Sequence, residues 1–407
     1  MATLKLAKPT NNFTKSSSNS QEDSIFTLPI LPIELITEIL SKLPVKSLLK
    51  FRCVSKSWLA LISSPQFVKT HLSISARNQR VVLTDIENAL TRRETQIMLK
   101  DCSLSTLRNG SLNEASYLDY PMNDPRQSVS VLGSVNGLIC LAIEDNDLVL
   151  WNPSIKKFKK LPDCRLKFVD SGNAIPTTAI YGFGYDMSND DYKVVGVLCI
   201  EKRNILHHVE VEIYSLKSDS WKHKDDITNG VELVKPCKFV NGKLHWANNI
   251  TSGIHNDRNI ISLDLADEKW GKLEQPRYGE GDFFLKVEVL GSRLSVFQNH
   301  VKDHADVWIM REYGVNESWT KAYTLKYPNW FYSPFVSPTL CMSNSGDVFV
   351  VPGSNLTVHN PEDEPVIYPK AANSSFYVAV NIYIESLVCP SLPDEQTIDQ
   401  EGRLQML

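Results

Sequence analysis

An aromatic residue returns at a fixed interval in the second half of the chain. Trp221, Trp270, Trp319 and Tyr368 follow one another at steps of 49 residues, each near an apolar segment and a polar turn. Phe158 has the same place in an earlier segment, LVLWNPSIKKFKKLP, 63 residues before Trp221. A unit of this length is too small to bury its apolar faces alone, so such units are stable only when stacked on neighbours. The chain is therefore expected to be an array of repeated units.

The repeated units have the pattern of antiparallel hairpins. Apolar runs are short, rich in Val, Ile and aromatic residues, and often alternate with polar ones, as in VEVEI at 209–213, while turn pairs such as Asn136-Gly137 separate them. Four strands in roughly 40 to 50 residues is typical of a β-propeller blade. We expect about six blades, with strands before Asn109 pairing with those at 378–388 to close the ring. One or two β-sandwiches are the alternative, because hairpins alone do not determine the architecture.

The start of the chain has a different, helical pattern. Residues 1–24 are rich in Ser, Asn, Thr and Lys and are expected to be a disordered leader. From Pro32 to Leu43 apolar residues recur at helical spacing, and further short helices are expected at 45–51, 56–62 and from Ser64 onward. So small a bundle seldom folds unaided, and its apolar stripes point in two directions. One face is expected to meet a partner, unless the stripes are only the internal core of a cap on the rest of the chain.

The helical segment resembles the F-box of plant proteins. LPIEL at 31–35, ILSKLPVKSLL at 39–49, FRCVSKSW at 51–58 and LISSPQF at 61–67 match that motif in order and without a gap. In the family the bundle docks on a Skp-type adaptor, which bridges to the cullin and RING subunits of a ubiquitin ligase. The adaptor-contact residues that the resemblance implies are Leu31, Pro32, Leu35, Ile39, Leu43, Pro44, Leu48 and Phe51.

The β region resembles the F-box-associated domain of the same proteins, which are often labelled F-box/kelch-repeat. The matching motifs are GSVNGL at 133–138, LWNPS at 150–154, YGFGYD at 181–186, DYKVV at 191–195 and VNGKLHW at 240–246. The sequence has no double glycine, which the kelch signature includes, so the domain is at most kelch-like. The two resemblances imply an α+β multidomain chain: a small N-terminal helical F-box at 25–72, a mainly-β, kelch-like propeller of about six blades at 73–390, and a flexible tail at 391–407.

Charge and composition exclude several kinds of partner. With 43 Lys and Arg against 47 Asp and Glu the formal net charge is -4, so no overall positive field favours nucleic acid or anionic lipid. No run of 18 apolar residues and no signal-peptide pattern occurs, so we expect no membrane partner. The eight cysteines form no CxxC pair, which favours free thiols in a reducing compartment. We expect the chain in the cytoplasm and nucleus.

The motifs of enzymes and cofactor sites are weak in this sequence. Gly182-Phe183-Gly184 lacks the third glycine of a dinucleotide loop, and neither GxSxG nor HExxH occurs. We expect no catalytic residues, no metal site and no cofactor. For target binding the candidates are Trp330, Phe331 and Tyr332, because the prolines on both sides disfavour a central strand and leave these rings available as anchors. The alternative is that the rings fill a gap between blades.

Together these features indicate the substrate-recognition subunit of an SCF-type (Skp–cullin–F-box) ubiquitin ligase, with no bond chemistry of its own. The propeller would hold an unknown target protein, so that its lysines meet the ubiquitin-charged enzyme at high effective concentration. Two other classes stay open. One is a propeller enzyme of the glycan hydrolase type with an appended helical segment, which acidic residues converging at the ring centre would favour. The other is an F-box interaction protein that recruits no target for degradation.

Overall fold

The computed structural model describes residues 31–391 with several gaps. The gaps are at 76–77, 89–94, 109–114, 123, 125–126, 145–146, 165–178, 203–204, 225–232, 249–258, 279–282, 301–303, 327–338, 344–345, 352–355, 360–365 and 369–374. The predicted leader at 1–24 lies outside the described residues, as does the predicted tail except for Ser391.

Four short helices form an N-terminal helical unit, residues 31–75, as the apolar spacing predicted. They are α1 (Ile33–Ser41), α2 (Val45–Phe51), α3 (Lys56–Ser63) and α4 (Pro65–Ser75). Pro32 and Pro44 stand directly before α1 and α2, where a residue without a backbone N–H costs the helix nothing. Ser55 caps α3 by accepting a hydrogen bond from the backbone N–H of Trp58 at 3.1 Å. Among the described helices none is long and apolar enough to cross a membrane.

The rest of the described chain is mainly β-strand. The strands before the middle of the chain are β1 (Gln79–Asn88), β2 (Thr95–Ser103), β3 (Ser116–Tyr117), β4 (Val129–Val135), β5 (Leu138–Ile143), β6 (Asp147–Asn152), β7 (Lys157–Lys160), β8 (Ile180–Asp186), β9 (Asp191–Lys202) and β10 (Ile205–Ser215). The following strands are β11 (Ser220–Lys224), β12 (Leu233–Val240), β13 (Lys243–Asn248), β14 (Asn259–Asp264), β15 (Trp270–Leu273), β16 (Phe283–Leu290), β17 (Arg293–His300), β18 (His304–Met310) and β19 (Trp319–Lys326). The last are β20 (Thr339–Met342), β21 (Val348–Val351), β22 (Leu356–His359), β23 (Val366–Tyr368) and β24 (Ser375–Ile384). A short helix, α5 (Leu104–Arg108), follows β2, and a 3-10 turn, η2 (Asn316–Ser318), precedes β19.

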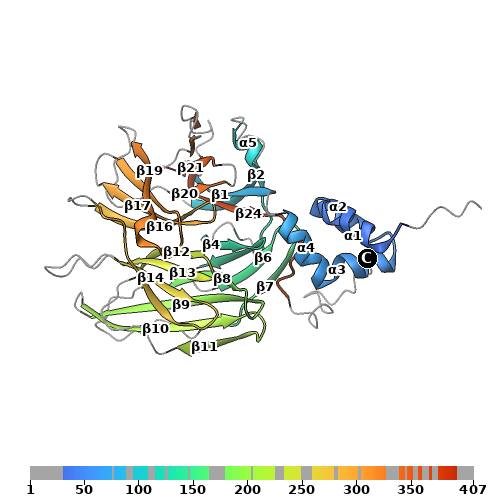
Figure 1. Ribbon diagram of the computed structural model, residues 1–407, viewed down its shortest axis with the longest axis horizontal. Helices are drawn as coiled ribbons and strands as arrows, with labels where there is room; N and C mark the ends of the chain where they lie inside the picture. The colour runs from blue at the N-terminus through green and yellow to red at the C-terminus, as the bar shows by residue number, and fades with distance from the viewer. Residues whose placement is uncertain are drawn as a thin grey trace, which may run out of the picture.

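These strands form a β-propeller built from antiparallel meanders (Figure 1). Hydrogen bonds group the described strands into five sheets, four of four strands and one of eight. The eight-stranded sheet consists of two meanders, β16–β19 and β20–β23, joined through the parallel pair Leu290↔Met342. The described residues thus contain six four-stranded units, five meanders and one sheet completed by β24, and hydrogen bonds merge two of the meanders, so that there are five sheets where about six blades were predicted.

The ring closes by pairing the last strand with the first. β24 runs antiparallel to β1, from Gln79↔Ile384 to Glu87↔Ser375, and completes the sheet β24-β1-β2-β3. This confirms the predicted pairing of strands before Asn109 with those at 378–388. The strand from the far end of the sequence is therefore part of the first blade, and this pairing joins the two ends of the β-strand array.

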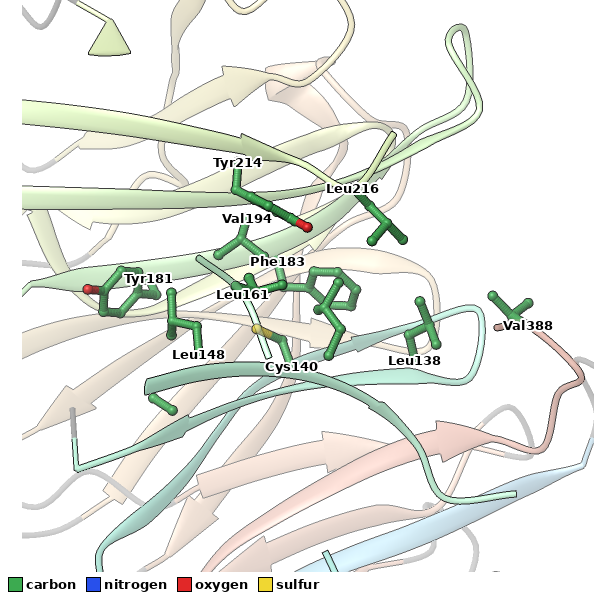
Figure 2. Packing of buried hydrophobic residues seen from close by; sticks show 12 residues of the cluster. Leu138, Cys140, Leu148, Leu161, Tyr181, Phe183, Val194, Tyr214, Leu216 and Val388 are labelled. Atoms are coloured by element: carbon green, nitrogen blue, oxygen red, sulfur yellow. The ribbon is translucent and has the colours of Figure 1, made fainter. Parts of the chain in front are cut away.

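The alternation of side chains explains how one strand serves two neighbouring blades. In β5, LICLAI, all six residues are buried. Leu138 and Cys140 point toward β8–β11 and pack in a cluster with Phe183 (Figure 2), whereas Ile139 and Leu141 lie in a different cluster on the opposite face. Successive residues of a strand point to opposite faces, so an uninterrupted apolar strand indicates a sheet that is covered on both sides.

The repeated aromatic residues occupy the fourth strand of their meanders. Phe158 lies in β7, Trp221 in β11, Trp270 in β15, Trp319 in β19 and Tyr368 in β23. The first four lie at the first or second position of the strand, whereas the last is the third residue of its strand. The interval of 49 residues therefore identifies successive blades, with a shift of register in the final one.

Trp319 and Trp270 are expected to differ in their contribution to stability. The Trp319 side chain is buried, at 8% exposure, and its Nε1 donates a hydrogen bond to the carbonyl of Glu274 at 3.1 Å. Trp270 is only half-buried and packs on Trp246 with ring centroids 5.6 Å apart. Removing the more deeply buried Trp319 ring leaves the larger cavity. Trp319→Ala should therefore lower the free energy of unfolding by about 3–5 kcal/mol, and Trp270→Ala should lower it by less. Urea unfolding of both variants checks this, and equal losses would contradict it.

The two faces of the propeller differ in what they contact. On the face that we call proximal, the β4–β5 turn at Gly137 meets the C-terminal segment: a Cβ at Gly137, whose φ is +83°, would lie 2.6 Å from the Cβ of Ser386. Ile155, in the β6–β7 turn of the same face, packs against the core of the helical unit. The other ends of these strands, such as the end of β5, the start of β6, the end of β17 and the start of β18, belong to the opposite, distal face, because antiparallel strands reverse direction at each turn.

Candidate functional site

The helical unit exposes an apolar stripe on α1. Leu31, Leu35 and Ile39 follow one another at intervals of four residues and are exposed at 50%, 47% and 54%. We call these three residues the outer α1 stripe. The opposite side of α1 carries Leu40, which is buried in the core of the unit. Leu35 and Ile39 are four residues apart and therefore lie on one face of α1, turned away from that core, and Leu31 lies just before the helix.

The other predicted adaptor contacts divide by exposure. Pro32 and Pro44 are exposed, whereas Leu43 and Phe51 are half-buried against the core of the unit. Leu48 is 0% exposed and belongs to that core, together with Leu40, Val45, Ile62 and Phe67. α2 turns Leu48 inward, so in this structure Leu48 packs in the core of the unit, and its role as an adaptor contact stays a prediction.

Four exposed large apolar residues of the helical unit were not among the predicted contacts. They are Ile33, Val54, Leu59 and Ile74, exposed at 53%, 61%, 46% and 41%. On α3 the inward stripe is formed by Trp58, Leu61 and Ile62, and at 100° per residue Leu59 lies outside it. The position of Leu59 outside the inward stripe was the signal in the sequence that could have identified it as an exposed residue. Large apolar side chains gathered on one small unit mark a binding surface more strongly than isolated ones do.

The helical unit is also more basic than the chain as a whole. Residues 31–75 contain six Lys and Arg, Lys42, Lys46, Lys50, Arg52, Lys56 and Lys69, against two acidic residues, Glu34 and Glu38. Lys42 and Glu38 form an exposed pair at 2.7 Å, one turn apart on α1. The formal net charge of the whole chain is -4. The charge of the helical unit as a whole therefore favours a partner that carries acidic groups.

The C-terminal segment joins the helical unit to the propeller. Leu387 lies in the core of the helical unit, and Val388 lies in the cluster between β4–β7 and β8–β11, near Leu138 (Figure 2). The Asn152 side-chain amide, at the end of β6, donates hydrogen bonds to the carbonyls of Ser386 at 3.0 Å and Val388 at 2.8 Å. Figure 1 shows the helices at one side of the propeller, close to this segment. The two units thus share a core and are held in a defined arrangement.

An ion pair between the units supports the same arrangement. Lys69 on α4 lies 2.6 Å from Asp190, in the turn between β8 and β9. Tyr185 donates a hydrogen bond to the same carboxylate. The hydrogen bond from Lys69 has the largest effect in holding the pKa of Asp190 below its ordinary value, and the hydrogen bond from Tyr185 has the next largest. Both partners of the ion pair are more than half exposed, so its contribution to stability is small, and its main effect is on orientation.

The predicted target-binding residues Trp330, Phe331 and Tyr332 lie outside the described residues. Their segment leaves β19 after Lys326 and enters β20 at Thr339. Both strand ends belong to the distal face, which is opposite the helical unit. The role of these rings stays a prediction.

A cavity of about 290 Å³ lies where the inner strands β4, β8, β12, β16, β20 and β24 converge. Of the described residues that line it, Glu288 alone is acidic. Its carboxylate is 1% exposed and lies 2.7 Å from Lys238 and 3.1 Å from Lys286. Burial opposes ionisation, but the two ammonium groups hold the pKa of Glu288 below its ordinary value. Glycoside hydrolysis uses a pair of carboxylates, so this lining gives no support to the hydrolase alternative.

His245 should make the propeller sensitive to acid. This β13 residue is fully buried, its Nε2 lies 2.9 Å from the Tyr313 hydroxyl, and burial lowers its pKa from 6.5 to about 4. As the pH falls, the unfolded chain therefore takes up a proton on this histidine before the folded chain does. The contribution of neutral His245 to the free energy of unfolding is complete above pH 6.5 and is lost as the pH falls toward 4. The free energy of unfolding falls by about 3 kcal/mol over this range.

The measurement is the unfolding free energy of the chain and of a His245→Gln variant at several pH values between 7 and 4. Carboxylates titrate in both proteins, so the difference in slope isolates the histidine. Parallel pH dependences would show that folding does not lower the pKa of His245.

Comparison with protein families and known proteins agrees with this architecture. Residues 28–70 match the F-box domain, and residues 80–389 match the F-box associated beta propeller domain. An F-box/kelch-repeat protein of Arabidopsis thaliana is 32% identical over 366 residues, covering 89% of this chain and 96% of that protein. The Arabidopsis thaliana F-box protein CPR1 is 29% identical over 318 residues, covering 73% of each.

Among solved structures, a lectin of Aleuria aurantia in complex with alpha-methyl-L-fucoside aligns with a TM-score of 0.40 and 11% identity, covering 72% of this chain and 97% of the lectin. The two family matches together cover most of the chain, and the helical unit and the propeller correspond to them in order. The F-box implies binding of a Skp-type adaptor. The chain belongs to the plant F-box proteins that carry an F-box-associated β-propeller domain.

Proposed function

We propose that this protein is the substrate-recognition subunit of an SCF-type ubiquitin ligase. The observation that carries the proposal is the outer α1 stripe: an F-box that leaves Leu31, Leu35 and Ile39 exposed beside a folded propeller. In this proposal the stripe contacts the Skp-type adaptor, which connects to the cullin and RING subunits, and the protein itself catalyses no reaction. We retain 25–72 and 73–390 as the proposed domain bounds, and the cytoplasm and nucleus as the proposed location.

The exposed apolar surface is large enough for such a contact. Six side chains contribute, namely Leu31, Ile33, Leu35, Ile39, Val54 and Leu59. Each side chain is about half exposed, so burying the rest of it contributes roughly 0.7–1.5 kcal/mol, a gross favourable free energy of about 4–9 kcal/mol. Association costs about 4–15 kcal/mol in lost freedom of motion, so the apolar contact offsets part of it and polar contacts supply the remainder.

The propeller would hold the target protein on its distal face. The proximal face is already occupied by the helical unit and the C-terminal segment, through Ile155, Leu387 and Val388. Because those contacts hold the propeller against the F-box, a target on the distal face would stand in a defined direction relative to the ligase. Trp330, Phe331 and Tyr332 are the proposed anchors.

The experiment is affinity capture with the full chain, in plant cells in which the cullin-dependent ligases are inactivated so that targets persist. Co-purification of the adaptor, the cullin and the RING subunit supports the ligase role, as does a captured protein whose lifetime lengthens when the chain is removed. If the adaptor is captured but the lifetime of every captured protein is unchanged, the non-degradative alternative is correct. If no adaptor is captured, the proposed function fails.

A further inference from the structure

Two histidines and an aspartate meet on the β17–β18 hairpin, near the distal face. The strands pair antiparallel through Asn299↔Ala305, so His300 and His304 come opposite each other at the next position. Asp306 is two residues along β18 from His304 and therefore lies on the same face of the sheet. The two imidazole rings are stacked, with centroids 4.3 Å apart and planes at 20°.

The nitrogen and oxygen atoms of this cluster converge. The Asp306 Oδ2 atom lies 3.6 Å from His300 Nε2 and 4.0 Å from His304 Nε2, and one ligand atom from each residue falls within 4.8 Å of the others. Ligands of a tetrahedral zinc ion at bond lengths of 2.0–2.2 Å are about 3.4 Å apart. Side-chain movements below about 1 Å would bring the three atoms to that spacing.

A second observation points to a ligand at the same place. The Nε2 atom of His300 is buried and has no hydrogen-bond partner. A buried polar atom without a partner costs free energy, and such atoms in a native fold are few. Coordination of a metal ion would satisfy this nitrogen.

The aspartate is oriented so that one oxygen is left for the histidines. Its Oδ1 atom accepts a hydrogen bond from the Thr324 hydroxyl at 2.7 Å and lies 2.8 Å from the Lys321 ammonium. Oδ2 is the oxygen that faces both imidazoles. Donors that fix a ligating carboxylate in this way are a regular part of metal sites, because they orient the coordinating atom.

We propose that His300, His304 and Asp306 bind a zinc ion. Two imidazole nitrogens and one carboxylate oxygen favour Zn²⁺ over Mg²⁺ and Ca²⁺, which take oxygen ligands. With three protein ligands, the fourth position is open to water or to a side chain of a bound protein. The ion would tie β17 to β18 at their distal ends, beside Lys326, which pairs with His304 where the chain leaves β19. The site is independent of the proposed ligase function.

The test is titration of the purified full chain with zinc salt by calorimetry, with Mg²⁺ and Ca²⁺ as comparison ions. Cys53 is an exposed thiol, so all proteins carry Cys53→Ser to remove that competing ligand. The variants are His300→Gln, His304→Gln and the positioning variant Thr324→Val. The matched control is His223→Gln, because His223 also lies beside a carboxylate, Glu212 at 3.5 Å, but on a different blade. Circular dichroism verifies the fold of each protein.

The expected result is one zinc ion per chain, with binding weakened at least about tenfold by either histidine variant and several-fold by Thr324→Val. His223→Gln should bind zinc as the parent does, and neither Mg²⁺ nor Ca²⁺ should compete. Zinc should also raise the melting temperature of the parent but not of the histidine variants. If the parent binds no zinc, or if the histidine variants bind it equally well, the site does not exist. If His300→Gln does not fold, the His304→Gln titration and the zinc-dependent melting temperature of the parent decide between these outcomes.

Discussion

A chain carrying Leu35→Asp and Ile39→Asp is expected to lose capture of a Skp-type adaptor while its propeller remains folded. The two residues are exposed at 47% and 54%, so charging them leaves the core of the F-box unchanged. In a complex the same two charges would have to be buried without partners, at a cost of several kcal/mol. Because each 1.4 kcal/mol is a factor of ten in affinity, the loss should be at least about a hundredfold. Quantitative pull-down with the adaptor measures it.

The control for this prediction is a charge placed elsewhere on the same unit. Ile74 on α4 is exposed at 41% and is not part of the outer α1 stripe. Ile74→Asp therefore tests whether a charge at an exposed apolar position outside the stripe weakens adaptor binding as much as charges within it. Undiminished capture by the double variant, or equal loss in the Ile74 variant, would refute the assignment of the stripe as the contact. The elution volume and circular dichroism of both variants should match those of the parent.

Local signals in the sequence predicted the helices and the blades. Pro32, Pro44 and Ser55 stand at helix starts because their backbone or side-chain chemistry suits those positions, and each acts within a few residues. The interval between Trp270 and Trp319 predicted the blades because every unit repeats the same strand order. These features need no knowledge of distant contacts.

Contacts between distant segments could not be predicted in the same way. Helical spacing shows that Leu48 is on an apolar face, but which side of α2 faces the other helices depends on how the four helices pack. Leu387 completes the core of a unit more than 300 residues earlier in the chain, and no local pattern indicates this. The approach of His300 and His304 was not predicted either, because it depends on the register of the β17–β18 hairpin.

The largest effect on the fold is expected from the C-terminal strand. Ending the chain after residue 374 removes β24 and the segment that joins the two units, whereas ending it after Ser391 removes only residues beyond them. The first truncation should abolish cooperative folding, because it leaves β1 paired only with β2 and deletes side chains from four separate clusters of buried residues. Cooperative thermal unfolding, followed by circular dichroism, should be seen only with the longer chain.

The size of that effect follows from the buried residues that are lost. Val380, Tyr383, Leu387 and Val388 are each at most 9% exposed, and burial of such side chains contributes roughly 1.5–3 kcal/mol apiece. Their sum, about 6–12 kcal/mol, is comparable with the whole stability of a typical domain, roughly 5–15 kcal/mol. A milder variant, Leu387→Ala, should destabilise the F-box by about 2–5 kcal/mol and leave β24 paired with β1. If the chain ending at 374 instead melts cooperatively at the temperature of the longer one, the β24–β1 pairing does not hold the ring closed, and the propeller must be stable as an open array.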